Sequence, residues 1–309
     1  MPVPLRSTAF PDVLDPRFAV IFNDEFNMEP DRIGDFFSVI SGGESPTKDT
    51  YRMSQMGTFG DVPEFTGSVI YDDVNEGYDT TLTHKEYASG LQIERKLFDD
   101  AQFGIIDDKP RGLSQAYART RQKHAASIFN NAFSVDTTWQ TGGDAVALCS
   151  DSHTTRAAGV STATGFDNLT TSSLTAVALQ AARIQFRNFR DDRANIQSFI
   201  PDGLLIPPDL EGDAYEITQS EGKPDTANNN ANINRGRYKV SDWIYLTDVN
   251  NWYIYDTTLM KRFLKWINRI DVEFAMVEEL DTIIGKWRLY ARHSLGYGDW
   301  RWIIGSQVS

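Results

Sequence analysis

The sequence predicts an α+β protein in which the helices are segregated from mostly antiparallel strands. Three observations support this class. Apolar residues recur with a helical period over 111–133, alternate with polar residues over 87–93, and form a short continuous run at 204–206. No internal repeat is found along the 309 residues. A hydrophobic content of 40% supplies ample material for a core.

The first forty residues predict an arm with short helical pieces. Asp15 is expected to be an N-cap, with Pro16 at the first helical position. Phe18, Phe22 and Phe26 then recur every four residues and form an apolar stripe. The proline-rich flanks suggest that the arm reaches away from its own core. We therefore expect these three rings to contact another copy of the chain.

Residues 41–78 lose helical periodicity and are rich in Gly, Pro, Asp and Thr. A compact domain rarely contains a structureless connection of this length, so the segment predicts a long protruding hairpin. The stretch "GDVPEFTG" is expected near its turn, and 66–71 as a short extended run. Apolar side chains on this segment are expected to pack on another surface, such as that of a second copy. They are Met53, Met56, Phe59 and Phe65.

Alternation from Tyr87 to Ile93 predicts a strand of the body, followed by a short helix from about Leu97. The clearest helix is expected over 111–133. It carries a basic cluster at its middle, which is weak support for an acidic partner. The cluster is Arg119, Arg121 and Lys123.

A second helix is predicted after residue 173, with caps at 171–173. Its expected apolar face is Leu174, Val177, Ala181, Ile184 and Phe186. The run 204–206 predicts a buried strand, and Pro207 and Pro208 precede a helix starting near Asp209. An Asn-rich surface loop follows over 218–237.

Aromatic strands are predicted over 238–256, and two alternating runs flank a glycine-rich turn near residue 297. In the first run the alternating positions are Trp287, Leu289 and Ala291, and in the second they are Trp300, Trp302 and Ile304. The pattern predicts that these two runs pair with each other as a hairpin.

The charge balance is acidic, with 30 Lys and Arg against 43 Asp and Glu and a net charge of −13. Such a chain repels phosphate backbones, so direct nucleic-acid binding as the main activity is not expected. One cysteine permits no internal disulfide, which fits a reducing cytoplasm. The sequence contains neither a signal-peptide pattern nor an apolar run long enough to span a membrane. These features predict a soluble cytoplasmic protein.

The stretch "LCSDSH", 148–153, brings Cys149 within four residues of His153 and raises the hypothesis of a nucleophilic site. Its residue types favour turns and caps, and catalytic Cys/His pairs usually meet from distant parts of a chain. The sequence therefore favours a turn whose Ser, Asp and His side chains bond to local backbone, with Cys149 as a small buried residue.

The other sites with chemical potential give weak patterns. His84, His124 and His293 are scattered and lack metal-ligand spacing, and one Cys cannot build a zinc site. The paired aspartates are adjacent, so their side chains point in different directions, and no glycine-bearing turn has phosphate-binding spacing. No catalytic, metal or cofactor residue is predicted. The long apolar extensions instead favour a self-assembling structural protein.

Four stretches in order resemble a known family. They are "GDVPEFTG", "YASGLQIERKLFDDAQFG" ahead of the long helix, "LCSDSH" after it, and "GLLIPPDLEGDAYEI". This order resembles the Mu-like major head subunit group of tailed-phage major capsid proteins, over roughly residues 55–220. The family usually has an aromatic residue where this chain has Leu148 and Cys149.

The resemblance implies the HK-ninety-seven-type phage capsid fold and no catalytic residues. On this sequence it implies an N-terminal arm at 1–42 and an extended E-loop at 43–80. A peripheral domain is implied at 81–167 with its spine helix at 111–133, an axial domain at 168–283, and returning peripheral strands at 284–309.

The same resemblance implies a virion protein, assembled in the host bacterial cytoplasm into pentamers and hexamers of an icosahedral shell around double-stranded DNA. The implied partners are a scaffolding protein, a portal and, in some members of the family, a decoration or cement protein. No charged N-terminal region suggests a fused scaffold, so a separate one is expected. Two alternatives stay open: a Cys149/His153-dependent hydrolase or transferase, and an encapsulin-type nanocompartment shell protein.

Overall fold

The structure is a computed structural model that describes residues 10–28, 30–41, 48–94, 96, 103–224, 230–279 and 284–308. The helices are α1 (Phe10–Met28), α2 (Ile33–Phe36), α4 (Phe103–Asn130), α5 (Ala176–Arg187), η3 (Pro208–Leu210), α6 (Glu211–Gln219) and α7 (Thr257–Phe263). The strands are β1 (Ser38–Ile40), β2 (Thr50–Met56), β3 (Glu76–Thr83), β4 (Lys85–Glu94), β5 (Gln140–Gly142), β6 (Leu169–Thr170), β7 (Gly203–Ile206), β8 (Lys239–Asp242), β9 (Trp252–Tyr255), β10 (Leu264–Glu279), β11 (Ile284–Tyr297) and β12 (Ile303–Ser306).

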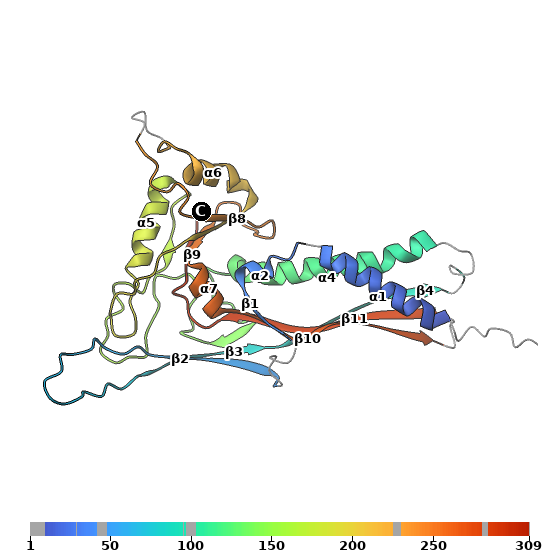
Figure 1. Cartoon of the computed structure of the whole chain (residues 1–309), viewed down its shortest axis with the longest axis horizontal. Helices are drawn as coiled ribbons and strands as arrows, with labels where there is room; N and C mark the ends of the chain where they lie inside the picture. The colour runs from blue at the N-terminus through green and yellow to red at the C-terminus, as the bar shows by residue number, and fades with distance from the viewer. Residues whose placement is uncertain are drawn as a thin grey trace, which may run out of the picture.

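Two lobes and a hairpin make up the molecule (Figure 1). One lobe is elongated: α1 and α4 lie along one face of a four-stranded sheet ordered β1-β10-β11-β4. The other lobe is built on a five-stranded sheet ordered β6-β12-β9-β7-β8, with α5, α6 and α7 around it. A third sheet, β2-β3-β5, carries the hairpin. Most strand pairs are antiparallel, which confirms the predicted α+β class.

The long helix α4 begins eight residues before the predicted start and ends three residues before the predicted end. Proline is disfavoured inside a helix, and Pro110 directly precedes the predicted start. The structure carries the helix through Pro110, and Ile106 from the added turns is buried against Phe18 and Trp287. Burial of this apolar side chain offsets the cost of the proline.

The helix α1 also starts earlier than predicted, since it includes Phe10 and runs through Asp15 and Pro16. The expected N-cap is therefore an interior position. In β4 the alternation is confirmed, because Tyr87, Leu91 and Ile93 are partly or fully buried while their neighbours are exposed. The helix expected from about Leu97 lies outside the described residues.

The core-facing side of α5 agrees with the predicted one only in part: Leu174, just before the helix, and Phe186 are buried as predicted, and Ala181 is exposed. Leu179, Ala182 and Phe186 are buried, whereas Val177 and Ile184 are exposed. Both sides of the helix carry apolar residues, so the helical period alone did not choose between them. The helix is capped by Thr175, whose hydroxyl accepts a hydrogen bond from the Ala178 amide.

The C-terminal hairpin prediction is wrong. β11 pairs with β10 and β4, while β12 lies in the other sheet between β6 and β9. The turn at 298–302 carries the chain from one sheet to the other, and Trp300 and Trp302 are buried in the core of the second lobe. Burial of these two rings there favours the crossing over a local hairpin.

The buried strand 204–206 is confirmed as β7, in which every residue is buried. The Asn-rich stretch was predicted as a surface loop, and in its described part a buried side chain joins it to α6. Asn232 is buried and donates to the Ile217 and Ser220 carbonyls at the end of α6, at 2.8 and 3.1 Å. These bonds satisfy carbonyls that the helix end leaves without partners.

Candidate inter-subunit surface

The hairpin formed by β2 and β3 ends in a long tip, residues 57–75, which has no regular secondary structure (Figure 1). β2 and β3 pair antiparallel from Thr50↔Thr83 to Met56↔Glu76, and the Gly57 amide donates to the Asn75 carbonyl at 2.8 Å. The tip therefore begins where strand pairing ends, and it projects from the body at the base of the second lobe.

Large apolar side chains on and beside this tip face solvent. Val62 is 95% exposed and Tyr71 91% exposed. The full set is Met56, Phe59, Val62, Phe65, Val69, Ile70 and Tyr71. Scattered apolar residues are normal on a protein surface, but a set concentrated in one segment marks an interaction site. The loop tip is therefore a candidate docking element.

The predicted hairpin residues fall at different depths. Met56, Phe59 and Phe65 are exposed, while Met53 is half-buried beside Gly298. The extended run expected at 66–71 is not a strand. Val62, Val69, Ile70 and Tyr71 were missed as contact candidates, although their apolar character inside a Gly- and Asp-rich segment was the available signal.

The aromatic stripe of the N-terminal arm packs on its own chain. Phe18 lies edge-on to Trp287, with ring centroids 5.0 Å apart, and Phe22 stacks on Phe274 at 5.0 Å. The Ser114 hydroxyl of α4 donates to the Phe22 carbonyl at 2.9 Å. Phe18 and Phe22 are fully buried within the chain, so in this conformation neither ring is available to a second copy. This intrachain packing replaces the contact expected for them.

In the basic cluster of α4, one residue contacts its own chain and two are exposed. Arg121 lies over the rings of Phe26 and Trp266, 5.3 and 5.5 Å from their centroids, and pairs with Asp31 at 3.5 Å. These contacts also hold Phe26 against its own chain, where it is half-buried. Arg119 and Lys123 are exposed and accessible to a partner.

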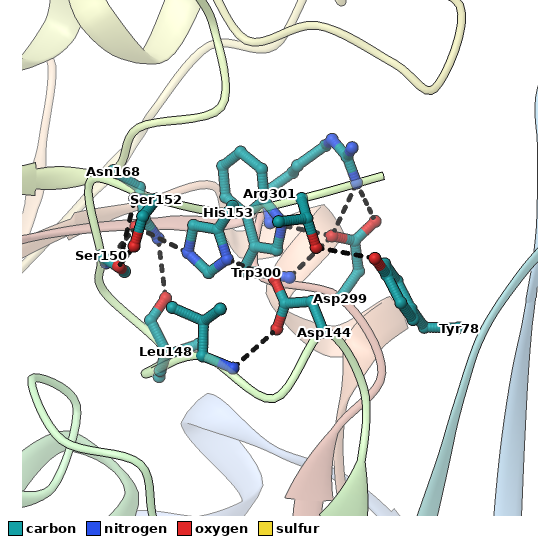
Figure 2. A network of polar contacts seen from close by, with 12 residues as sticks. Tyr78, Asp144, Leu148, Ser150, Ser152, His153, Asn168, Asp299, Trp300 and Arg301 are labelled. Carbon is teal, nitrogen blue, oxygen red and sulfur yellow. Dashed lines mark hydrogen bonds and ion pairs between the residues drawn. The ribbon is translucent and has the colours of Figure 1, made fainter. Parts of the chain in front are cut away.

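The "LCSDSH" stretch holds a buried polar network rather than a nucleophilic pair (Figure 2). Cys149 is buried, and this burial raises the pKa of its thiol well above the usual range, which disfavours the reactive thiolate. The ring of His153 faces Asp144 Oδ2 with Nδ1, at 2.6 Å, and Asn168 Oδ1 with Nε2, at 3.1 Å. Both ring nitrogens therefore have side-chain partners, and the local backbone bonds predicted for His153 are not made.

Asn168 connects this loop to the second sheet (Figure 2). Its Nδ2 donates to the Leu148 carbonyl at 2.8 Å and to the Ile303 carbonyl of β12 at 3.1 Å. Its Oδ1 accepts from the Ser150 amide at 2.8 Å. His153 also stacks on Trp300, with centroids 4.1 Å apart and planes inclined by 7°. The stretch thus fixes the chain after α4 to the core of the second lobe.

Among the described residues, no group of three or more His, Cys, Asp or Glu side chains is placed to hold a metal ion. No helix in the described part of the chain combines the length and apolar character that a membrane crossing requires.

A protein-family model described as phage capsid protein matches residues 77–305, which is most of the chain. The chain belongs to the phage capsid protein family. The matched range includes α4 and, apart from β1 and the last residue of β12, the strands of both lobe sheets, so it covers the fold rather than one motif. No curated protein matches this capsid protein.

Solved structures share the fold at low sequence identity. The bacteriophage JBD30 procapsid subunit has a TM-score of 0.52 and 14% identity, covering 97% of this chain and 76% of that chain. The capsid subunit of an empty GTA particle has a TM-score of 0.52 and 13% identity, covering 94% and 99%. A Microbacterium phage Oxtober96 chain has a TM-score of 0.52 and 12% identity, covering 91% and 93%. At this identity the likeness concerns the α+β capsid fold.

Family and fold agree on a structural role. The capsid protein is a shell-forming subunit and a component of the virion, and it associates with copies of itself. Neither the hydrolase or transferase alternative nor the encapsulin alternative gains support from these comparisons. The finer assignment to the Mu-like group stays a prediction.

Proposed function

We propose that this capsid protein assembles as pentamers and hexamers into an icosahedral shell around double-stranded DNA, and that the loop tip at 57–75 is its main contact with a neighbouring copy. The exposed apolar set on the tip carries the proposal. Packing those side chains against a neighbour removes apolar surface from water, which is the usual driving force of association.

The implied domain division is retained as part of the proposal, with two revisions. The arm (1–42), the E-loop (43–80) and the peripheral domain (81–167) with α4 as spine helix are kept. β10 shares a sheet with β11 and β4, and β7, β8 and β9 form another. We therefore propose that the axial domain ends near Leu264 rather than at 283, and that β10 and β11 both belong to the peripheral domain. Because β12 lies in the second sheet, we assign it to the axial domain.

The proposed partners follow from the shell role. A separate scaffolding protein would guide assembly in the host bacterial cytoplasm, and a portal would occupy one vertex. One solved JBD30 capsid of similar fold is described as decorated with minor capsid protein trimers. A decoration or cement protein is therefore proposed here as well. Arg119 and Lys123, exposed on α4, are proposed to meet acidic residues of a neighbour.

The net charge of −13 fits a container that does not adhere to its cargo. An acidic inner wall repels the phosphate backbone, so we propose no specific nucleic-acid binding. We also propose that the protein has no enzymatic activity. Under this proposal a Cys149→Ala variant forms particles as the wild type does. A turnover reaction that this variant loses would restore the enzyme hypothesis.

The experiment replaces residues 58–74 by Asn-Gly. We call Gly57, Thr58 and Asn75, where the tip joins β2 and β3, the neck of the tip. Because the Gly57 amide donates to the Asn75 carbonyl, a two-residue turn can join these two residues, and β2 and β3 then keep their pairing. A wider deletion of 44–76 would also remove β2 from its sheet. We expect a folded subunit, with wild-type circular dichroism, that does not close into stable shells by electron microscopy. Normal particles from this variant would contradict the proposed role of the tip.

A further inference from the structure

A turn of the second lobe, residues 190–195, contacts the neck of the loop tip. The turn follows α5, and its contacts with the tip join residues 120 to 134 positions apart. We call Asp191, Asp192 and Arg193 the latch. It contacts residues on both sides of the tip, those leaving β2 and those returning to β3.

On the outgoing side the latch binds Thr58. The Thr58 amide donates to Asp192 Oδ1 at 2.9 Å, and its hydroxyl lies 2.8 Å from Asp191 Oδ2 and 2.6 Å from Asp192 Oδ1. Gly57 allows this approach: a Cβ there would lie 2.2 Å from Asp192 Oδ2 and 2.8 Å from the Asn75 carbonyl oxygen. A side chain at residue 57 would therefore separate the neck from the latch.

On the returning side the latch binds Asp72. The two terminal nitrogens of Arg193 face the two carboxylate oxygens of Asp72, at 2.9 and 3.0 Å, and one of them also donates to the Asp73 carbonyl. Paired contacts of this kind fix orientation as well as distance. Asp72 Oδ2 also accepts from the Gly60 amide at 2.8 Å, so Arg193 is connected to both sides of the tip.

The latch is held rigidly by its own lobe. Asp191 Oδ1 accepts from the amides of Arg193 and Asn195, each at 2.8 Å, and Asp191 is buried. Arg301 Nε donates to the Arg190 carbonyl at 2.8 Å, and the Gln197 amide donates to the Phe189 carbonyl at 2.7 Å. Ala194 has a φ of 64°, a conformation unusual for a residue with a side chain, which this network maintains.

We propose that Asp191, Asp192 and Arg193 are positioning residues for shell assembly: they fix the direction in which the apolar tip is presented to a second copy. This inference rests on the proposed role of the tip. The described tip has no regular structure or core of its own that could set its direction, so contacts at its neck decide its orientation. Orienting the tip in advance lowers the entropic cost of docking.

The experiment reverses one charge at a time and then both. Arg193→Asp and Asp72→Arg each place like charges together, while the double variant restores an opposite pair. The matched control is Arg235→Asp, because Arg235 pairs with Glu221 at 3.0 Å on a surface loop away from the tip. Hydrogen exchange is followed at the amides of Thr58 and Gly60 in the unassembled chain, and shell yield is measured by sedimentation.

We expect each single reversal to speed exchange of those two amides by about tenfold, to lower the shell yield, and to leave the unfolding temperature of the body unchanged. The double variant is expected to recover part of both effects, and Arg235→Asp to match the wild type. If the Thr58 and Gly60 amides of Arg193→Asp exchange at the wild-type rate, the latch does not hold the tip. Faster exchange with a wild-type shell yield would overturn the positioning role.

These outcomes are separate from a failure of the proposed function. If the chain with 58–74 replaced by Asn-Gly assembles normally, the tip is not the main contact, whatever the latch variants do. If that chain fails to assemble while Arg193→Asp assembles as the wild type does, the tip role stands and the positioning inference is wrong.

Discussion

The core of the second lobe and the loop tip are both rich in large apolar side chains, and they place them in opposite environments. In the lobe, Trp252, Trp302 and Ile304 are fully buried around the five-stranded sheet. In the tip, Val62 and Tyr71 are almost fully exposed. Similar residue types therefore form a core in one region and an exposed apolar surface in the other, depending on whether the chain itself covers them.

The difference separates the apolar surface that stabilises the folded chain from the apolar surface that can stabilise an assembly. A buried tryptophan stabilises the isolated chain, because unfolding returns its surface to water. An exposed side chain on the tip contributes almost nothing to folding, yet it retains its apolar surface for a neighbour to bury. Substitutions in the two regions should therefore affect different measurements.

The largest effect on stability is expected from Trp302→Ala. Trp302 is fully buried and lies edge-on to Phe129 of α4, with centroids 6.2 Å apart. Removing the indole leaves a cavity, which costs about 3–5 kcal/mol of unfolding free energy. Urea unfolding of the unassembled chain measures this loss. An unchanged unfolding midpoint would contradict the claim that the buried tryptophans of the second lobe stabilise the isolated chain.

A smaller loss is expected from Asn168→Ala, which leaves the Ser150 amide and the Leu148 and Ile303 carbonyls without their side-chain partner. Unpaired buried groups of this kind cost about 2–3 kcal/mol in total. The same urea titration measures the change. Asn188→Ala, at an exposed position after α5, is the matched control and should change stability little.

Acid should weaken the first lobe through a pair of histidines, of which His293 is buried and His124 half-buried. His124 Nδ1 lies 3.2 Å from His293 Nε2 between α4 and β11. Burial lowers the pKa of His124 to about 4, helped by Lys85, and burial lowers the pKa of His293 to about 3, with further contributions from His124 and Arg121. Both rings are therefore neutral in the folded chain at pH values where the unfolded chain protonates them.

The direction of the pH dependence of stability follows from these lowered pKa values. Their contribution to stability is complete above about pH 6.5, the unfolded value, and falls as the pH drops toward 4, by up to about 1.4 kcal/mol per pH unit for each ring. Urea unfolding at several pH values measures the slope. Replacing His124 by Gln should flatten it between pH 6.5 and 4. A slope equal to that of the wild type would show that other groups set the acid response.

The smallest effect on stability is expected from the double change Val62→Ser and Tyr71→Ser. Because both side chains are already in solvent, the unfolding free energy should change by less than about 0.5 kcal/mol. The shell yield should nevertheless fall, as counted by electron microscopy. Val135→Ser, at an exposed site outside the tip, is the control and should leave the yield unchanged. A large loss of stability in the tip variant would break the comparison.

The sequence predicted those strands whose burial produces a regular pattern of apolar residues. The alternation of β4 and the continuous run of β7 reflect one-sided and two-sided burial, so both strands were found. β10 was not found, because register shifts between Asn268 and Ile270 and between Ile270 and Glu273 interrupt its alternation. The pairing of β11 depends on that hidden strand, and a hairpin with the next run was predicted instead.

The candidate surface was partly predictable for the same reason. Apolar residues inside a segment with no period pointed to the tip. The burial of Phe18 and Phe22 could not be predicted, because their partners Trp287 and Phe274 lie more than 200 positions away. The latch leaves no local pattern either, since the short run of Asp191, Asp192 and Arg193 looks like any solvated turn until Thr58 and Asp72 are placed beside it.

The position of β12 has a consequence for synthesis of the subunit. Although it is the last strand in chain order, it lies inside its sheet, between β6 and β9. Until residues 303–306 have left the ribosome, the two neighbouring strands have no partner between them and the second lobe cannot close. A chain that stops short of residue 303 therefore lacks the strand that joins β6 to β9, and its second sheet stays divided.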